Sequence, residues 1–230
     1  MGDATVRRVD FGYFIRPAEE TGTGAARAEP CLGYLVRHPD GVVLLDTGMG
    51  ADPDVDAHYR PRRRDLGTAL AGAGAVIAEV GLVVNCHLHF DHCGGNPALA
   101  GRPVFTQRTE LDAAISAADY TLPGLIDAPG LRYELLDGEA EILPGVFVIP
   151  TPGHTAGHQS LVVRQPDGTV VVAGQAHDTA TTYSADALAW RAQRDGAAPG
   201  VPAPPQWLDR LMEFDPARVV FAHDQAVWVP

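Results

Sequence analysis

Residues 87–92, with the sequence HLHFDH, constrain this chain more than any other segment. The segment follows the apolar run Leu82-Val83-Val84, and a short apolar run of this kind predicts a buried strand. The polar side chains are therefore expected in the loop where that strand ends. Four of these residues are potential metal ligands: His87, His89, Asp91 and His92. Imidazole and carboxylate groups bind zinc, iron or manganese, so the segment predicts a metal site at a strand end.

The spacing of these ligands indicates that they converge. In an extended segment His87 and His89 point to the same side, and Asp91 and His92 can fold back toward them after the turn. A cluster with more than four donors favours two ions over one. The alternative is a polar loop that binds no metal. Three of the nine histidines in the chain fall within these six residues, however, which is not chance clustering.

The pattern His-x-His-x-Asp-His, followed by Gly94 and Gly95, resembles the signature of the metallo-β-lactamase superfamily. We expect the two glycines to allow the backbone conformations of the turn. Later motifs are most similar to the N-acyl-homoserine lactonase branch. The resemblance implies an α/β fold, an αββα four-layer sandwich of two mixed β-sheets flanked by helices. It spans Leu32 to Asp224, and we expect residues 1–230 to form a single domain.

Composition limits the partners of the chain. The formal net charge of −12 argues against nucleic acid or an anionic membrane. No apolar run approaches the length of a membrane span, and residues 1–14 lack the apolar core of a signal peptide. Three cysteines, Cys31, Cys86 and Cys93, form no disulfide framework, which favours a cytoplasmic location. We interpret Cys86 and Cys93 as small buried thiols in preference to metal ligands.

Further residues match the family's motifs. His154, after the Pro-Gly that follows a predicted strand, matches the next metal ligand, and His223 matches the final one. His158 matches a supporting histidine. Asp46 follows the apolar run at residues 42–45, and in the family its carboxylate orients a ligand histidine. From the local sequence alone, an aspartate that caps a turn is an equal interpretation of Asp46.

The resemblance implies two metal sites. The first would hold His87, His89 and His154, and the second Asp91, His92 and His223, with Gln175 or a neighbour between them. We expect one or two zinc ions, with iron or manganese as alternatives. In this family Asp91 also orients the attacking hydroxide and relays its proton.

The chain departs from the family's pattern at Gln175. The family normally has an aspartate there, which bridges both metals, and lactonases have a tyrosine three residues later, where this chain has Asp178. Glutamine offers a neutral carbonyl oxygen, so the second ion should bind more weakly. His177 is a possible substitute ligand, since in a strand it would face the same side as Gln175. Asp178 is the other possible substitute, and we consider it as a catalytic residue together with Asp91. The alternative is that His177 and Asp178 are polar loop residues only.

The function that this pattern favours is a metal-dependent hydrolase that opens a small lactone, as in quorum quenching, by attack of hydroxide generated at the metal. Residues 118–130 suit a pocket wall, and their apolar side chains would contact an acyl chain or belong to the core: Tyr120, Leu122, Leu125 and Ile126. The alternatives are a hydrolase or thioesterase of a biosynthetic intermediate, and a metal-binding protein catalytically altered by Gln175. The expected partner is a small molecule; the oligomeric state is open.

Turn and periodicity signals predict the remaining elements. The Pro-Asp-Gly turns at residues 38–41 and 165–168 each lie between apolar runs and predict hairpins. Residues 17–30 predict a loop, and residues 51–64 a charged surface loop over the mouth of the site. Residues 65–79 are rich in Ala and Leu and predict a helix.

Overall fold

Two mixed β-sheets face each other in the computed structural model of the chain, which describes residues 4–197 and 200–230. The first sheet contains β1 (Thr5–Arg16), β2 (Arg27–His38), β3 (Gly41–Leu45), β4 (Arg62–Arg63), β5 (Leu82–Val84), β6 (Pro103–Gln107) and β7 (Arg132–Leu136). The second contains β8 (Ala140–Leu143), β9 (Val146–Pro150), β10 (Gln159–Val163), β11 (Thr169–Val172) and β12 (Pro216–Val220). Their strand orders are β4-β1-β2-β3-β5-β6-β7 and β12-β11-β10-β9-β8.

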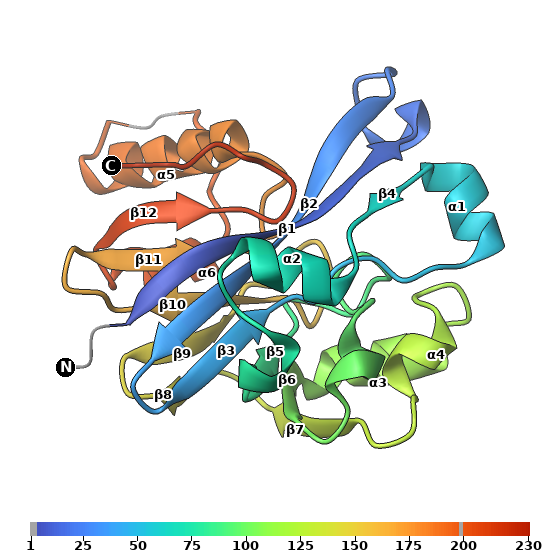
Figure 1. Cartoon of the computed structure of the whole chain (residues 1–230). Helices are drawn as coiled ribbons and strands as arrows, with labels where there is room; N and C mark the ends of the chain where they lie inside the picture. The colour runs from blue at the N-terminus through green and yellow to red at the C-terminus, as the bar shows by residue number, and fades with distance from the viewer. Residues whose placement is uncertain (1–3, 198–199) are drawn as a thin grey trace.

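Helices cover the outer faces of both sheets (Figure 1). The helices are α1 (Pro53–Tyr59), α2 (Leu66–Gly72), α3 (Arg108–Ser116), α4 (Pro123–Ile126), α5 (Ala180–Arg194) and α6 (Trp207–Met212). Short 3-10 helices are η1 (Ala18–Glu20), η2 (Ile77–Glu79) and η3 (Asn96–Leu99). Within the described part of the chain, no helix is long and apolar enough to cross a membrane.

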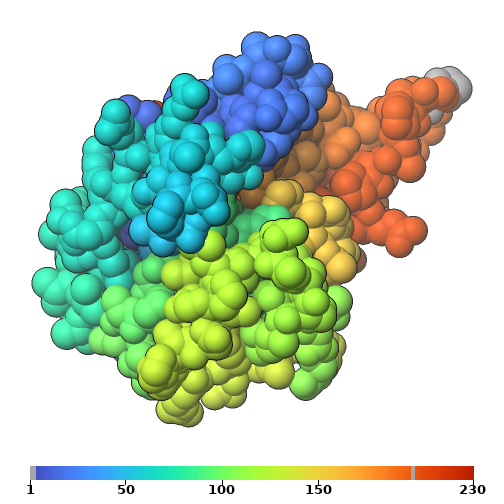
Figure 2. Space-filling view, turned by 90° about the vertical axis from the view of Figure 1, so that its right-hand side faces the viewer, coloured from blue at the N-terminus to red at the C-terminus, as the bar shows by residue number. Residues whose placement is uncertain are grey.

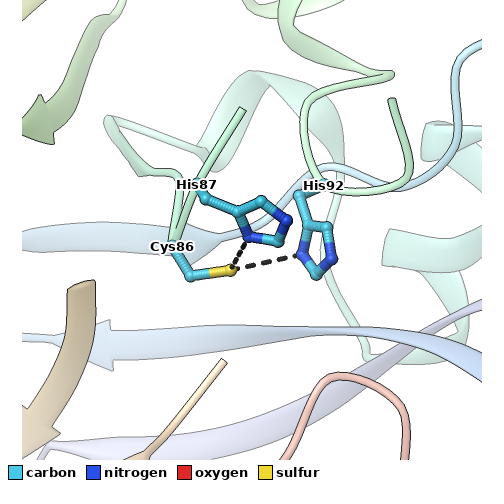
Figure 3. Close-up of side chains that lie close together, drawn as sticks. All are labelled: Cys86, His87 and His92. Carbon is cyan, nitrogen blue, oxygen red and sulfur yellow. Dashed lines mark hydrogen bonds between the residues drawn. The ribbon is translucent and has the colours of Figure 1, made fainter. Parts of the chain in front are cut away.

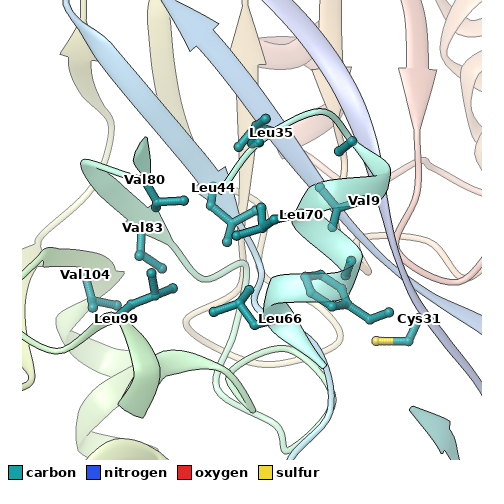
Figure 4. Packing of buried hydrophobic residues seen from close by; sticks show 14 of the residues in the cluster. Val9, Cys31, Leu35, Leu44, Leu66, Leu70, Val80, Val83, Leu99 and Val104 are labelled. Carbon is teal, nitrogen blue, oxygen red and sulfur yellow. The ribbon is translucent and has the colours of Figure 1, made fainter. Parts of the chain in front are cut away.

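The alternation of side chains along β3 shows how the layers form. Val43 and Leu45 belong to the cluster between the two sheets, where they meet Val148 of β9. Leu44 points the other way, into the cluster beneath α2, where it meets Leu70 (Figure 4). Successive residues of a strand point to opposite faces, so one apolar run supplies two cores. A third cluster packs α5 and α6 on the second sheet. The predicted αββα sandwich is confirmed.

Both predicted hairpins are confirmed, by the pairs His38↔Gly41 of β2 and β3 and Val163↔Val170 of β10 and β11. The loop predicted over residues 17–30 is wrong at its end, because β2 begins at Arg27 and pairs with β1 there.

Two predictions near the mouth of the site need correction. The helix predicted over residues 65–79 is shorter: α2 ends at Gly72, and Gly74 has a left-handed φ of 78°. The charged loop of residues 51–64 contains α1, because the Asp52 side chain accepts hydrogen bonds from two backbone N–H groups and caps the helix.

Parallel pairing places the site at one edge of the sandwich. β3 is parallel to β5, so Asp46 and the loop at residues 87–92 follow neighbouring strand ends. In the second sheet β11 is parallel to β12, which brings Gln175 and His223 to neighbouring strand ends. Between the sheets, Leu32 N donates a 2.9 Å hydrogen bond to the carbonyl oxygen of Ala222.

Candidate metal centre

His87, His89 and His154 form a first group of potential ligands. Nε2 of His87 lies 3.0 Å from Nδ1 of His89, which lies 3.2 Å from Nε2 of His154. Nitrogen ligands on one tetrahedral zinc ion are separated by about 3.3 Å, since each Zn–N bond is about 2.0–2.1 Å long. Burial, together with the neighbouring imidazole of His92, holds the pKa of His87 well below its usual value. The neutral ring is the form that binds a metal, so this group fits an ion.

Asp91, His92 and His223 form a second group. Nε2 of His92 lies 3.1 Å from Nε2 of His223. Asp91 Oδ2 lies 3.6 Å from the first of these atoms and 3.5 Å from the second. Burial opposes the ionisation of Asp91, but His92 and His223 outweigh it and lower its pKa to about 2. The second group therefore combines two imidazoles with a charged carboxylate, and its ligand atoms fit an ion as well as those of the first.

Hydrogen bonds fix the orientation of two rings of the second group. Asp46 Oδ2 lies 2.9 Å from Nδ1 of His92, and the carbonyl oxygen of Pro30 lies 2.9 Å from Nδ1 of His223. Each acceptor holds a proton on Nδ1. The lone pair of Nε2 is then free to bind an ion at the centre. The structure thus brings Asp46 to the position expected for a carboxylate that orients a ligand histidine.

Cys86 lies beside one histidine of each group, His87 and His92, as Figure 3 shows. Its Sγ atom is 3.2 Å from Nδ1 of His87 and 3.2 Å from Nδ1 of His92. These three residues are close enough to form a ligand group of their own. Cys86 approaches the Nδ1 atoms, however, whereas the Nε2 atoms face the centre. Burial, reinforced by Asp46, raises the pKa of the Cys86 thiol well above its usual value, which supports the interpretation of a small buried thiol.

Gly94 and Gly95, after the histidine segment, are required for a reason other than the turn conformation that we predicted. Gly94 and Gly95 do not adopt left-handed conformations. A Cβ atom on Gly94 would lie 2.1 Å from the carbonyl carbon of Met49, and one on Gly95 would lie 2.6 Å from Thr47 O. The glycines are therefore required because the segment after β3 passes directly over the segment after β5.

A pocket of about 510 Å³ opens above the two groups. His89, Asp91 and His154 lie in its lining, so both groups face the same space. Figure 2 shows the hollow on this face, bordered by α1 (cyan) and by the yellow-green segment near residue 120. A cavity of this size suits a small organic molecule.

Both apolar and acidic side chains line the pocket; the acidic ones outside the ligand groups are Glu20, Asp52, Asp54 and Asp119. The aromatic and aliphatic members of the lining are Phe14, Val55, Tyr59, Phe90, Tyr120 and Leu122. Of the four residues predicted for the wall, Tyr120 and Leu122 line the pocket, whereas Ile126 is buried against Leu88 and belongs to the core. Leu125 packs in the same cluster.

The sequence model of the metallo-beta-lactamase superfamily matches residues 26–223. The chain belongs to this superfamily. Among relatives, the N-acyl homoserine lactonase AttM of Rhizobium johnstonii is 30% identical over 236 residues, which cover 90% of this chain and 86% of that protein. The N-acyl homoserine lactonase AiiA of Bacillus thuringiensis subsp. kurstaki is 32% identical over 157 residues; the match spans only 62% of the length of that relative.

Solved structures of the superfamily have the same fold. A quorum-quenching N-acyl homoserine lactone lactonase is 25% identical, with a TM-score of 0.74 over 98% of this chain and 93% of that chain. The dizinc quorum-quenching lactonase AidC, at 17% identity, has a TM-score of 0.70 over 100% of this chain and 91% of its own. The second likeness concerns the fold alone.

Gln175, where this member of the superfamily departs from the pattern, lies at the centre. It is buried, lines the pocket and contacts His92. Its Nε2 donates a 3.1 Å hydrogen bond to Oδ1 of Asp178. Asp178 is half exposed, and its Oδ2 lies 4.0 Å from Arg27 Nη2. Asp178 therefore contacts the metal centre indirectly, by its hydrogen bond to Gln175.

The prediction that His177 faces the same side as Gln175 is wrong, because β11 ends at Val172 and the chain turns before either residue. His177 Nε2 lies 2.7 Å from Asp186 Oδ2 on α5. Its ring packs against those of Tyr183 and Trp207. In this geometry His177 does not substitute for the missing carboxylate.

His158 supports the centre from behind. Its Nε2 accepts a 3.0 Å hydrogen bond from the backbone N–H of Gln175, and its Nδ1 lies 3.1 Å from Thr151 O. The ring therefore cannot offer Nε2 to an ion, and it holds the Gln175 loop in place.

Sequence reasoning missed Glu110 and Arg16. Glu110 is fully buried beside the loops of the first group. Arg16 lines the pocket and is paired with the buried Glu29. For Glu110 and Arg16 the sequence gives one indication, a charged residue among the apolar positions of a helix or strand.

Proposed function

We propose that the protein is a metal-dependent hydrolase that opens a lactone of the N-acyl-homoserine type. The observation that carries the proposal is the pair of ligand groups, His87/His89/His154 and Asp91/His92/His223, facing one pocket. Relatives named N-acyl homoserine lactonases support the substrate class. We further propose zinc as the ion, because imidazole-rich groups with tetrahedral spacing suit it.

Two ions held here would polarise the ester carbonyl and lower the pKa of water toward neutrality. The chain's own residues then position the reactants. Asp91 lines the pocket, where its carboxylate is placed to orient the attacking water and relay its proton. The apolar wall, with Phe14 and Leu122, offers contact area for an acyl chain. Asp178 stands in the place of the family's tyrosine; burial opposes its ionisation, but the hydrogen bond from Gln175 outweighs burial and lowers its pKa, so Asp178 is suited to hold Gln175 in position and not to supply a proton.

A hydrolysis screen tests this proposal. Protein of known metal content is offered lactones, thioesters and β-lactams. The proposal expects lactones to be hydrolysed fastest. It fails if a thioester or a β-lactam turns over at least about a hundredfold faster than any lactone, a barrier difference of about 2.7 kcal/mol.

One observation favours a second function, that of a catalytically altered metal-binding protein. Gln175 offers an amide where the family has a charged bridge, and this amide is already engaged by Asp178. The same screen separates the two functions, because the altered protein would hold ions yet hydrolyse none of the esters.

We also propose a cytoplasmic location and a small-molecule substrate as the partner. The described cysteines, Cys31, Cys86 and Cys93, are buried and free, which suits a reducing compartment.

A further inference from the structure

Glu110, on α3, is fully buried, and its carboxylate accepts three hydrogen bonds. Its Oε1 accepts from the backbone N–H of Leu88 at 2.8 Å and from the hydroxyl of Tyr120 at 2.5 Å. Its Oε2 accepts from the hydroxyl of Thr155 at 2.7 Å. A buried carboxylate is costly unless such donors surround it, so the charge and its three partners stabilise each other.

The three donors all adjoin the first ligand group. Leu88 stands between His87 and His89 in the chain, and Thr155 directly follows His154. Tyr120 lines the pocket, and its ring centroid lies 4.8 Å from that of His89. One carboxylate thus connects two loops that are far apart in sequence and that supply the three histidines.

Gly157 shows how closely these parts are packed. A Cβ atom on this residue would lie 2.4 Å from the backbone nitrogen of Glu110. The loop after His154 therefore rests directly on the first turn of α3, at the backbone of Glu110.

We propose that Glu110 is a positioning residue: it sets the separation of the His87/His89 loop from the His154 loop, and thereby the geometry of the first ion's ligands. The inference rests on the proposed metal centre. Glu110 is not expected to touch the ion or the substrate, because its two oxygens are occupied by Leu88, Tyr120 and Thr155.

Glu110→Gln tests the proposal while preserving the size of the side chain. An amide must turn its NH₂ toward one of the three donors, so at least one hydrogen bond is lost or has to reverse. Zinc is titrated into metal-free protein against a competing chelator. The same titration of His154→Ala serves as the reference, and the binding step that is missing there is assigned to the first ion. We expect the first ion to bind at least about tenfold more weakly in Glu110→Gln. The second ion should be unaffected, and the amide of Leu88 should exchange hydrogen faster.

Two further variants keep the test decisive. Thr155→Val removes one donor with little change in volume, and it should weaken the first ion in the same direction; it decides the matter if Glu110→Gln does not fold. Asp186→Asn, which alters a carboxylate on α5 away from both loops, should leave both ions unchanged. The proposal is overturned if the folded variants lose thermal stability without metal but bind the first ion as the unmodified protein does. Absence of zinc binding by the unmodified protein would instead reject the proposed function.

Discussion

Asp46 Oδ2 lies 2.9 Å from Nδ1 of His92, and both side chains are about 1% exposed. Asp46 has a φ of 60°, in the left-handed region that non-glycine residues rarely occupy. Its backbone N–H donates to the carbonyl oxygen of Val84, and its Oδ1 accepts from the backbone N–H of Cys86. Because these bonds hold the strained conformation, the carboxylate has one orientation, and that orientation decides which nitrogen of His92 carries the proton.

Asp46→Asn should therefore weaken the second ion. Asparagine tolerates the left-handed conformation, so the fold should persist. With its oxygen held by the N–H of Cys86, the amide NH₂ would face Nδ1 of His92 and shift the proton to Nε2, where the ion binds. We expect about a 10- to 100-fold loss of affinity for the ion at Asp91, His92 and His223, measured by chelator competition. Unchanged affinity for both ions would show that Asp46 does not control the tautomer.

Gln175→Asp should tighten the second ion. The variant offers a charged oxygen to the space between the two groups, where Gln175 now offers a neutral one. We expect at least about tenfold tighter binding, or about 1.4 kcal/mol, and higher lactone hydrolysis at limiting zinc. Adding Asp178→Asn to the variant removes the neighbouring like charge and serves as the matched comparison. A fall in affinity in Gln175→Asp that the double variant restores would mean that Asp178 already supplies the missing charge.

His177→Ala should affect stability and leave the metal centre intact. The ring is paired with Asp186 and packed against Tyr183 and Trp207, so its removal leaves a void between α5 and α6. We expect a loss of about 1–3 kcal/mol in the free energy of unfolding, measured by denaturant titration. Both ions should bind as before. Loss of one ion would restore His177 as a ligand and contradict the geometry described above.

The sequence was informative where local chemistry determines structure. The apolar run before His87 and the turn at residues 38–41 predict a strand end and a hairpin, and the structure contains both. The convergence of His154 and His223 with the first segment came from family resemblance alone. Nothing local in the chain indicates that β9, β12 and β5 end at one edge of the sandwich.

The sequence was misleading where side-chain direction depends on where a strand ends. His177 was assigned to the side of Gln175 by strand alternation, but β11 ends at Val172, so alternation does not apply. The role of Glu110 could not be predicted from the sequence, because it arises from Leu88 and Thr155, which only the packed loops bring to it. Neither fact follows from residue type or spacing.

The most direct test of the central claim measures metal content and lactone hydrolysis on the same sample. Protein never exposed to chelator is analysed for elements, then stripped and reconstituted with zinc while hydrolysis of an N-acyl homoserine lactone is followed. We predict that the protein as purified holds a first-row transition metal. Stripping should abolish turnover, and zinc should restore it in unmodified protein but not in His154→Ala. Protein that holds no metal, or that hydrolyses the lactone equally well after stripping, would contradict the account.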